Sequence, residues 1–189
     1  MTILVDVDNT LNDLSTPFIE RVHELGYEFD KTKYTSWELA DAVIAPNPKE
    51  VVAGIFNNPD FWRQLKPRPG SYNSLAYLND RHKVIIATIP WRPTPEHREA
   101  KIRWLGYHFP FIKENQISFR KDKWNLPGDV IIDDKPETIK KCIDAGMITI
   151  MPSHPYNVDI PADVTFSSWK EIPKLFDNID QLIQEATMS

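Results

Sequence analysis

Two short acidic motifs carry the side chains of this sequence best suited to chemistry. Asp6 and Asp8 lie at the end of the apolar run from Ile3 to Val7. In an extended strand, residues two apart point to the same side. Paired carboxylates repel unless a cation or a proton lies between them, so this pair could bind a hard cation such as Mg²⁺ while supplying a nucleophile and a proton-transfer group. A strand ending in a solvated acidic turn is the alternative for this motif alone.

The second acidic motif, Asp133-Asp134, follows another short apolar run, Val130 to Ile132. An aspartate helix cap is one interpretation, because Pro136 suits the first turn of a helix. Both interpretations can hold together, since parallel strands that deliver carboxylates at their carboxyl ends place them in one crevice. So much buried charge is too costly without a bound metal.

Thr88 and Lys123 come between the two acidic motifs. Thr88 ends a third apolar run, and its hydroxyl could donate to a phosphate oxygen. Lys123 closes the basic stretch 120–123, and an ammonium stabilises the charge of a phosphoryl transition state. Alone, each is typical of a strand end or a solvated surface. The order Asp-x-Asp, Thr, Lys, Asp-Asp favours a shared site.

The remaining apolar patterns predict the elements that would position these residues. Strands alternate with helices, which indicates a mostly parallel sheet covered on both faces. Gly26 and Gly106 are expected just past the ends of two helices. The runs predict strands at 3–7, 82–88, 116–119, 129–133, 147–151 and 164–166, and helices at 14–25, 71–79, 93–105, 136–146 and 170–185.

The segment between the first strand and the rest of the core has a different pattern of apolar and polar residues. Residues 27–58 mix apolar and polar side chains and contain Pro46 and Pro48, which suggests helices and loops. We expect residues 14–65 to form a small helical cap, and residues 1–13 and 66–189 to form the α/β core.

Bulk properties agree with one compact core domain with a modest insertion. The 189 residues are 41% hydrophobic and 26% charged, and the net charge of −5 argues against a duplex-binding surface. The single cysteine, Cys142, is expected to pack in the core. With no membrane-length apolar run, a cytoplasmic protein with no membrane partner is expected.

The ordered motifs resemble those of the haloacid dehalogenase (HAD) superfamily of phosphotransferases. More closely, the chain resembles the 5′(3′)-deoxyribonucleotidases, over almost its whole length. The similar segments are 6–11 (D-x-D-x-T-L), 60–70 (aromatic pair through L-x-P-x-P-G), 87–90 (T-S-P, here Thr-Ile-Pro), 120–123 with 132–134 (R-D-K, then I-D-D), and 154–157 (His-Pro-Tyr-Asn).

This resemblance implies a HAD-like Rossmannoid sheet with a cap inserted after the first strand, and a Mg²⁺-dependent phosphatase for deoxyribonucleoside monophosphates. Asp6 would attack phosphorus to form an aspartyl-phosphate, and Asp8 would protonate the leaving oxygen and later help activate water. Thr88 and Lys123 would bind the phosphoryl oxygens, with Lys123 preferred to Lys121 because of its spacing to Asp133.

By the same resemblance, the metal would be held by the Asp6 carboxylate, the Asp8 backbone carbonyl and a carboxylate of Asp133 or Asp134. The choice between the last two stays open.

The base would lie among cap aromatics, although the same side chains could simply form the core of the cap. Ile89 replaces a family serine, which removes a hydroxyl near the phosphate. Arg92 stands near a family lysine and could substitute for its charge. The aromatic residues implied are Trp37, Phe56 and Trp62.

Two other functions remain open from the sequence: a HAD phosphatase for another small phosphoester such as a sugar phosphate, and a non-catalytic protein that binds phosphorylated ligands or a protein partner. A small nucleotide is the expected partner, with no nucleic-acid polymer. Base preference, 5′ or 3′ preference, deoxy or ribo selectivity and oligomeric state, including a homodimer, are not determined.

Overall fold

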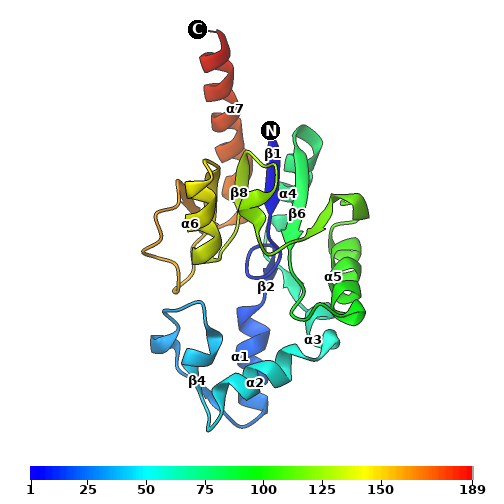
Figure 1. The fold of residues 1–189 in the computed structure, drawn as a ribbon, viewed down its shortest axis with the longest axis vertical. Coiled ribbons are helices and arrows are strands. Elements are labelled where there is room, and N and C mark those ends of the chain that lie inside the picture. Colours follow the sequence, from blue (N-terminus) through cyan, green and yellow to red (C-terminus); the bar gives the residue numbers. More distant parts are fainter. Residues whose placement is uncertain (189) are drawn as a thin grey trace.

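The core of the protein is one parallel sheet. The computed structural model describes residues 1–188, and its central sheet has six strands in the order β10-β9-β8-β1-β6-β7, every pair parallel (Figure 1). The expected α/β fold is therefore confirmed. The strands are β1 Thr2–Val5, β6 Lys83–Thr88, β7 Ile117–Phe119, β8 Val130–Ile132, β9 Ile148–Pro152 and β10 Val164–Phe166.

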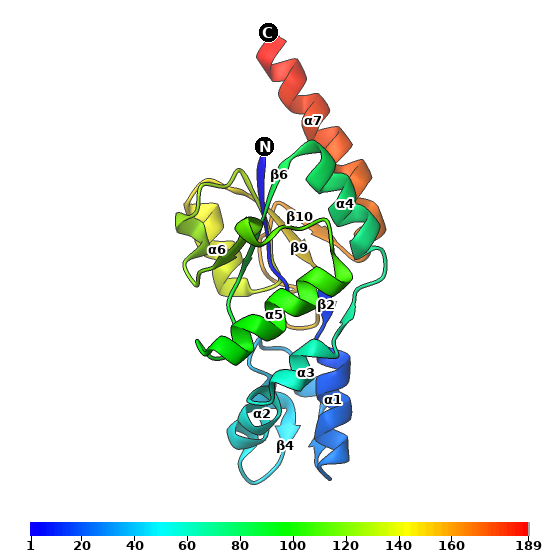
Figure 2. The ribbon, with the colours of Figure 1, turned by 90° about the vertical axis from the view of Figure 1, so that its right-hand side faces the viewer.

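Helices cover both faces of this sheet, because the strands are apolar on both sides. One face packs against α4 (Ser71–Arg81), α5 (Pro95–His108) and α7 (Ile172–Met188). The other face packs against α6 (Pro136–Asp144), where Cys142 is fully buried as expected. Figure 2 shows α7 extending beyond the sheet at the end opposite the cap.

The segment after β1 forms a separate layer at one end of the sheet (Figure 1). Its two-stranded sheet, β3 with β4, was not predicted, because two-residue strands show no periodic pattern. Its elements are α1 Ser15–Glu24, β3 Glu28–Phe29, β4 Val43–Ile44, α2 Pro48–Phe56 and α3 Pro59–Arg63, with 3₁₀ turns at Lys31–Lys33 and Leu39–Ala42.

The chain leaves and re-enters the core at a second small sheet. β2 (Asn12–Asp13) pairs antiparallel with β5 (Lys66–Pro67). Because this pairing ties the two connections together, we propose that residues 14–65 form a cap subdomain on a core of residues 1–13 and 66–189.

The end expected for α5 at Gly106 is wrong. Gly106 lies inside the helix, which continues to His108. A Cβ at this position would meet nothing within 4 Å, so no close packing requires glycine here. A helix tolerates one interior glycine at a cost of about 1 kcal/mol, and here the buried Trp104, Leu105 and Phe109 hold the last turn against the core. Gly26, in contrast, follows α1 as expected, with a φ of 81°.

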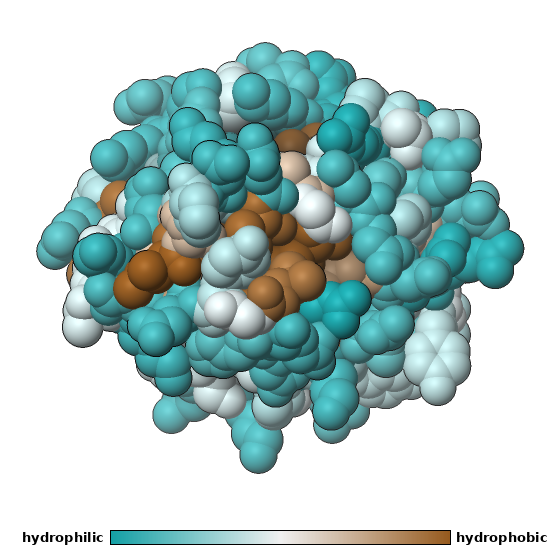
Figure 3. Space-filling model, turned by 90° about the horizontal axis from the view of Figure 1, so that it is seen from below, coloured by the Kyte–Doolittle hydropathy of each residue, from teal (hydrophilic) through white to brown (hydrophobic). Residues whose placement is uncertain are grey.

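The surface at the cap end is partly apolar. Figure 3 shows a strip of hydrophobic residues among polar ones on this face. Leu25 and Ile44 of the cap are each 49% exposed. Among residues 1–188, no helix combines the length and apolarity needed to cross a bilayer.

Candidate active site

The three central strands bring the motifs together at one edge of the sheet. β1 lies between β8 and β6, and Val5 is in register with both Ile132 and Ile86. Parallel strands end at the same edge, so the residues that follow them, Asp6 after β1 and Asp133 after β8, become neighbours of Thr88 at the end of β6.

Lys123 joins two of these strand ends. Its ammonium lies 2.5 Å from Asp6 Oδ1 and 2.6 Å from Asp133 Oδ2, and the side chain is 7% exposed. Burial alone would favour neutral lysine, but the two carboxylates outweigh it and raise the pKa of Lys123. Lys123 is therefore a fixed positive charge at the carboxyl ends of the strands.

Asp134, like Asp133, is a deeply buried carboxylate of the site. The Tyr156 hydroxyl donates to its Oδ2 at 2.6 Å, and the Thr10 hydroxyl lies 3.3 Å from its Oδ1. Burial, together with nearby Asp133 and Asp6, raises the pKa of Asp134 well above its ordinary value. Burial likewise raises the pKa of Asp133 to about 6.

The donor set fits a hard divalent cation. One oxygen from each of Asp6, Asp133 and Asp134 lies within 4.8 Å of the others. Lys123 contacts Asp6 and Asp133, so three buried carboxylates share one ammonium. Carboxylate oxygens are the ligands that Mg²⁺ prefers, so a cation among them would relieve the repulsion.

Thr88 offers a hydroxyl with nothing to bind. The residue is 1% exposed and lines the same cavity, and its Oγ1 has no hydrogen-bond partner among the described residues. Buried hydroxyls in native proteins are nearly always paired, so an unpaired one in a residue that lines a cavity points to a ligand oxygen or water as its partner.

Asp8 is held apart from the acidic cluster by a residue that we did not identify from the sequence. Lys101 of α5 lies 2.5 Å from Asp8 Oδ2, and Asn12 Nδ2 donates to Oδ1 at 3.1 Å. Lys101 is 3% exposed, within the helix face of Ala100, Trp104 and Leu105. A lysine on the apolar face of a predicted helix is the signal that could have revealed it, because such a charge needs a partner.

The turn after Asp8 depends on Asn9, whose φ of 54° is the one positive value among the described residues other than glycine. Its Oδ1 accepts from the backbone and hydroxyl of Ser15, and its carbonyl oxygen accepts from Arg68 at 3.0 Å. His154 Nε2 lies 2.9 Å from the same carbonyl. Residues far apart in sequence therefore fix the loop that carries Asp6 and Asp8.

His154 should make folding stability depend on pH. Burial, then the charge of Arg68, lowers the pKa of His154 from 6.5 to about 4. As the pH falls below 6.5, His154 becomes protonated in the unfolded chain, whereas in the folded protein it stays neutral until the pH approaches 4. We therefore expect this group to reduce the free energy of unfolding by up to about 3 kcal/mol between pH 6.5 and pH 4, and to have no such effect above pH 6.5.

Urea unfolding of the wild type and of His154→Gln over this pH range measures the effect. The variant should show a shallower decrease in unfolding free energy, because glutamine does not titrate. An identical decrease in both proteins would contradict the prediction.

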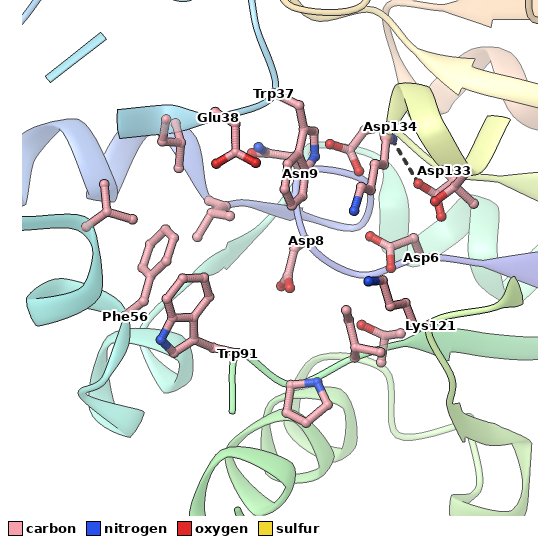
Figure 4. Close-up of a pocket in the computed structure, with 18 of the residues that line it drawn as sticks. Asp6, Asp8, Asn9, Trp37, Glu38, Phe56, Trp91, Lys121, Asp133 and Asp134 are labelled. Atoms are coloured by element: carbon pink, nitrogen blue, oxygen red, sulfur yellow. Dashed lines mark hydrogen bonds between the residues drawn. The ribbon is translucent and has the colours of Figure 1, made fainter. Parts of the chain in front are cut away.

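The site opens into a cavity of roughly 500 Å³ between core and cap, within the usual size of small-ligand pockets. Figure 4 shows Asp6, Asp133, Asp134 and Lys121 toward one side of it and Phe56 and Trp91 toward the other, with Asp8 between them. The core side is thus charged and the cap side mostly apolar.

The three aromatics expected around a base all line this cavity but differ in exposure. Trp37 is 42% exposed, whereas Phe56 and Trp62 are 4% and 5% exposed. Trp62 donates its Nε1 hydrogen to the Phe56 carbonyl oxygen, so it is bound into the cap. Trp91, which we did not identify from the sequence, packs edge-on to Phe56 and is 42% exposed. Trp37 and Trp91 therefore present more free surface than Trp62.

Ile89 and Arg92 lie at different places relative to the cavity. Ile89 lines the cavity as expected. Arg92 is not among the lining residues, and its Nε hydrogen is donated to Asn57 Oδ1 at 2.5 Å. The cations that do line the core side beside Lys123 are Lys121 and Lys135, and the Lys135 ammonium lies 4.1 Å from the centre of the Trp37 ring.

Comparison with known protein families gives one match over nearly the whole chain. Residues 1–182 match the family described as 5′ nucleotidase, deoxy (Pyrimidine), cytosolic type C protein. A 5′(3′)-deoxyribonucleotidase of Clostridium acetobutylicum is 28% identical over 71% of this chain and 73% of its own. A 5′(3′)-deoxyribonucleotidase of Bacillus subtilis is 23% identical over 91% of this chain and 96% of its own.

Solved structures share the fold at low sequence identity. A HAD family hydrolase from Deinococcus radiodurans, solved with bound phosphate and sodium, superposes with a TM-score of 0.62 at 16% identity, covering 94% of this chain and 95% of its own. At this identity the likeness establishes the architecture alone.

Proposed function

Because the chain belongs to the 5′ nucleotidase, deoxy (Pyrimidine), cytosolic type C family and is a HAD-fold phosphomonoesterase, we propose that it hydrolyses deoxyribonucleoside monophosphates with Mg²⁺ through an aspartyl-phosphate. The observation that carries this proposal is the buried, unpaired Thr88 hydroxyl in the same cavity as the Lys123 ammonium. Together they offer a hydrogen-bond donor and a fixed positive charge to phosphoryl oxygens.

The acidic residues take separate roles in this proposal. Asp6 attacks phosphorus, and the bond from phosphorus to the sugar oxygen breaks. Asp8 gives its proton to that oxygen, then accepts one from the water that hydrolyses the aspartyl-phosphate, which releases phosphate and restores Asp6. Lys101 and Asn12 hold the Asp8 carboxylate apart from the acidic cluster, so we do not assign its side chain to the metal.

The proposed metal ligands are the Asp6 carboxylate, the Asp8 backbone carbonyl and Asp134. We favour Asp134 over Asp133 because the Asp133 oxygens accept hydrogen bonds from Lys123 at 2.6 Å and from the Lys135 backbone at 2.8 Å, whereas Asp134 Oδ1 has only the Thr10 hydroxyl at 3.3 Å. When bound, Mg²⁺ would supply positive charge to the phosphoryl oxygens.

The cap side of the cavity suits a nucleobase. Trp37 and Trp91 expose ring surface, with Phe56 behind them, and aromatic faces stack on bases. A sugar phosphate, the alternative substrate, would leave this apolar surface uncovered. Neither a basic surface for polymer nor a second subunit is needed to complete the cavity.

Phosphate release from a panel of nucleotides and sugar phosphates tests the proposal. We expect Mg²⁺-dependent release that favours deoxyribonucleoside monophosphates over ribonucleotides and sugar phosphates, and loss of release in EDTA. Mg²⁺ should also raise the unfolding temperature of the wild type, and less so that of Asp134→Asn, because the cation binds the folded site. Release from sugar phosphates alone would reject the nucleotide assignment, and full activity in EDTA would reject the metal.

A further inference from the structure

A carboxylate without a partner faces the cap side of the cavity. Glu38 lines the cavity just before the 3₁₀ turn Leu39–Ala42, and Figure 4 shows its carboxylate beside Trp37. Among residues 1–188, no hydrogen bond or ion pair engages this carboxylate, although Lys49 also lines the cap side. Glu38 is therefore free to accept hydrogen bonds from a ligand stacked on Trp37.

Glu38 differs in this respect from the carboxylates on the core side. Asp6 and Asp133 are bound to Lys123, Asp8 to Lys101 and Asp134 to Tyr156. These four carboxylates therefore already have partners, at the end of the cavity where the phosphoryl group would bind. Glu38 is exposed and lines the cap side of the same cavity, where its charge can meet the base of a bound ligand.

The pyrimidine bases differ in what they would offer to such a carboxylate. Cytosine carries an amino group at position 4, which donates hydrogen bonds, whereas uracil and thymine carry a carbonyl oxygen there. A carboxylate accepts from the amino group and repels the carbonyl oxygen. The one ring N–H of uracil lies between two carbonyl oxygens, so turning the base does not remove the repulsion.

We propose that Glu38 is a specificity-determining residue that selects cytosine over uracil and thymine by accepting a hydrogen bond from the cytosine amino group. This inference rests on the proposed nucleotidase function and names its substrate as deoxycytidine monophosphate. Lys49 lines the same cavity, and its ammonium could donate to the O2 carbonyl of the same base. The attraction of the Glu38 carboxylate for cytosine and its repulsion of uracil and thymine both favour binding of cytosine.

The test compares dCMP with dUMP, which differ only in this edge of the base. The wild type should show a kcat/KM for dCMP about tenfold or more above that for dUMP, the scale of one charge-assisted hydrogen bond. In Glu38→Gln the ratio should fall to near unity, because an amide can either donate or accept. Binding of the two nucleotides to the inactive Asp6→Asn variant should show the same ratio and the same loss.

Glu50→Gln is the matched control. Glu50 is an exposed glutamate of α2, outside the lining of this cavity, so its substitution removes the same charge from the cap without touching the ligand. Its dCMP to dUMP ratio should equal that of the wild type.

Two results would overturn the proposal: equal hydrolysis of dCMP and dUMP by the wild type, or a dCMP preference that survives in Glu38→Gln. Either would leave the nucleotidase function standing, because both nucleotides would still be hydrolysed. Hydrolysis of sugar phosphates with no release from any nucleotide would instead reject the proposed function itself.

Discussion

Replacement of Asp6 by asparagine is expected to reduce kcat by at least about a thousandfold, while the protein stays folded. An amide is a poor nucleophile for phosphorus and a weaker ligand for a cation, so the proposed aspartyl-phosphate does not form. The fold should tolerate the change for two reasons. Lys123 keeps its contact with Asp133 at 2.6 Å. The cluster of Asp6, Asp133 and Asp134 also loses one of its mutually repelling negative charges. Phosphate release and urea unfolding in EDTA measure the two effects separately.

Asp80→Asn is the control for this experiment, since its side chain is 81% exposed on α4. It should match the wild type in both measurements. Turnover by Asp6→Asn at the wild-type rate would remove Asp6 as the nucleophile. A large loss of stability in that variant would show that its inactivity reflects unfolding.

Replacement of Lys123 by methionine is expected to damage both catalysis and folding. Methionine fills a similar volume but leaves Asp6, Asp133 and Asp134 without the ammonium that contacts two of them. Removing one partner of a buried ion pair typically reduces the free energy of unfolding by about 3 to 5 kcal/mol. Without the cation near the phosphoryl oxygens, kcat should fall at least about a hundredfold.

The stability loss should be smaller in Mg²⁺ than in EDTA, because a bound cation also offsets the carboxylate charges. Urea unfolding in the two buffers measures this difference. Lys140→Met, a change at an exposed position of α6, should leave stability and activity unchanged. A Lys123→Met protein as stable as the wild type in EDTA would mean that the buried carboxylates are protonated and need no counter-charge.

Local sequence patterns were sufficient for the central sheet. Continuous apolar runs such as Val130–Ile132 are buried on both faces, and such runs are typical of parallel strands between helices. The same patterns placed α6 and β10 correctly, whereas the end of α5 was misplaced because tertiary packing outweighs the helix-breaking tendency of Gly106.

The cap was predicted only in outline. Its two-residue strands are set by pairing across the fold and leave no period in the sequence. The exposure of its aromatics likewise depends on tertiary contacts, so Trp62 is buried against Phe56 while Trp91 remains available to a ligand.

Local patterns in the sequence were enough to select the candidate residues of the site, because Asp6, Thr88, Lys123 and Asp133 each follow or flank a run that predicts a strand end. The partners of these residues follow from the folded arrangement and not from the sequence pattern. Lys101, Tyr156 and Glu38 come from elements remote in sequence, and whether each charge is paired, buried or free depends on distances of a few ångströms across the fold. Electrostatic interactions depend on those distances and on burial, so no local pattern encodes them.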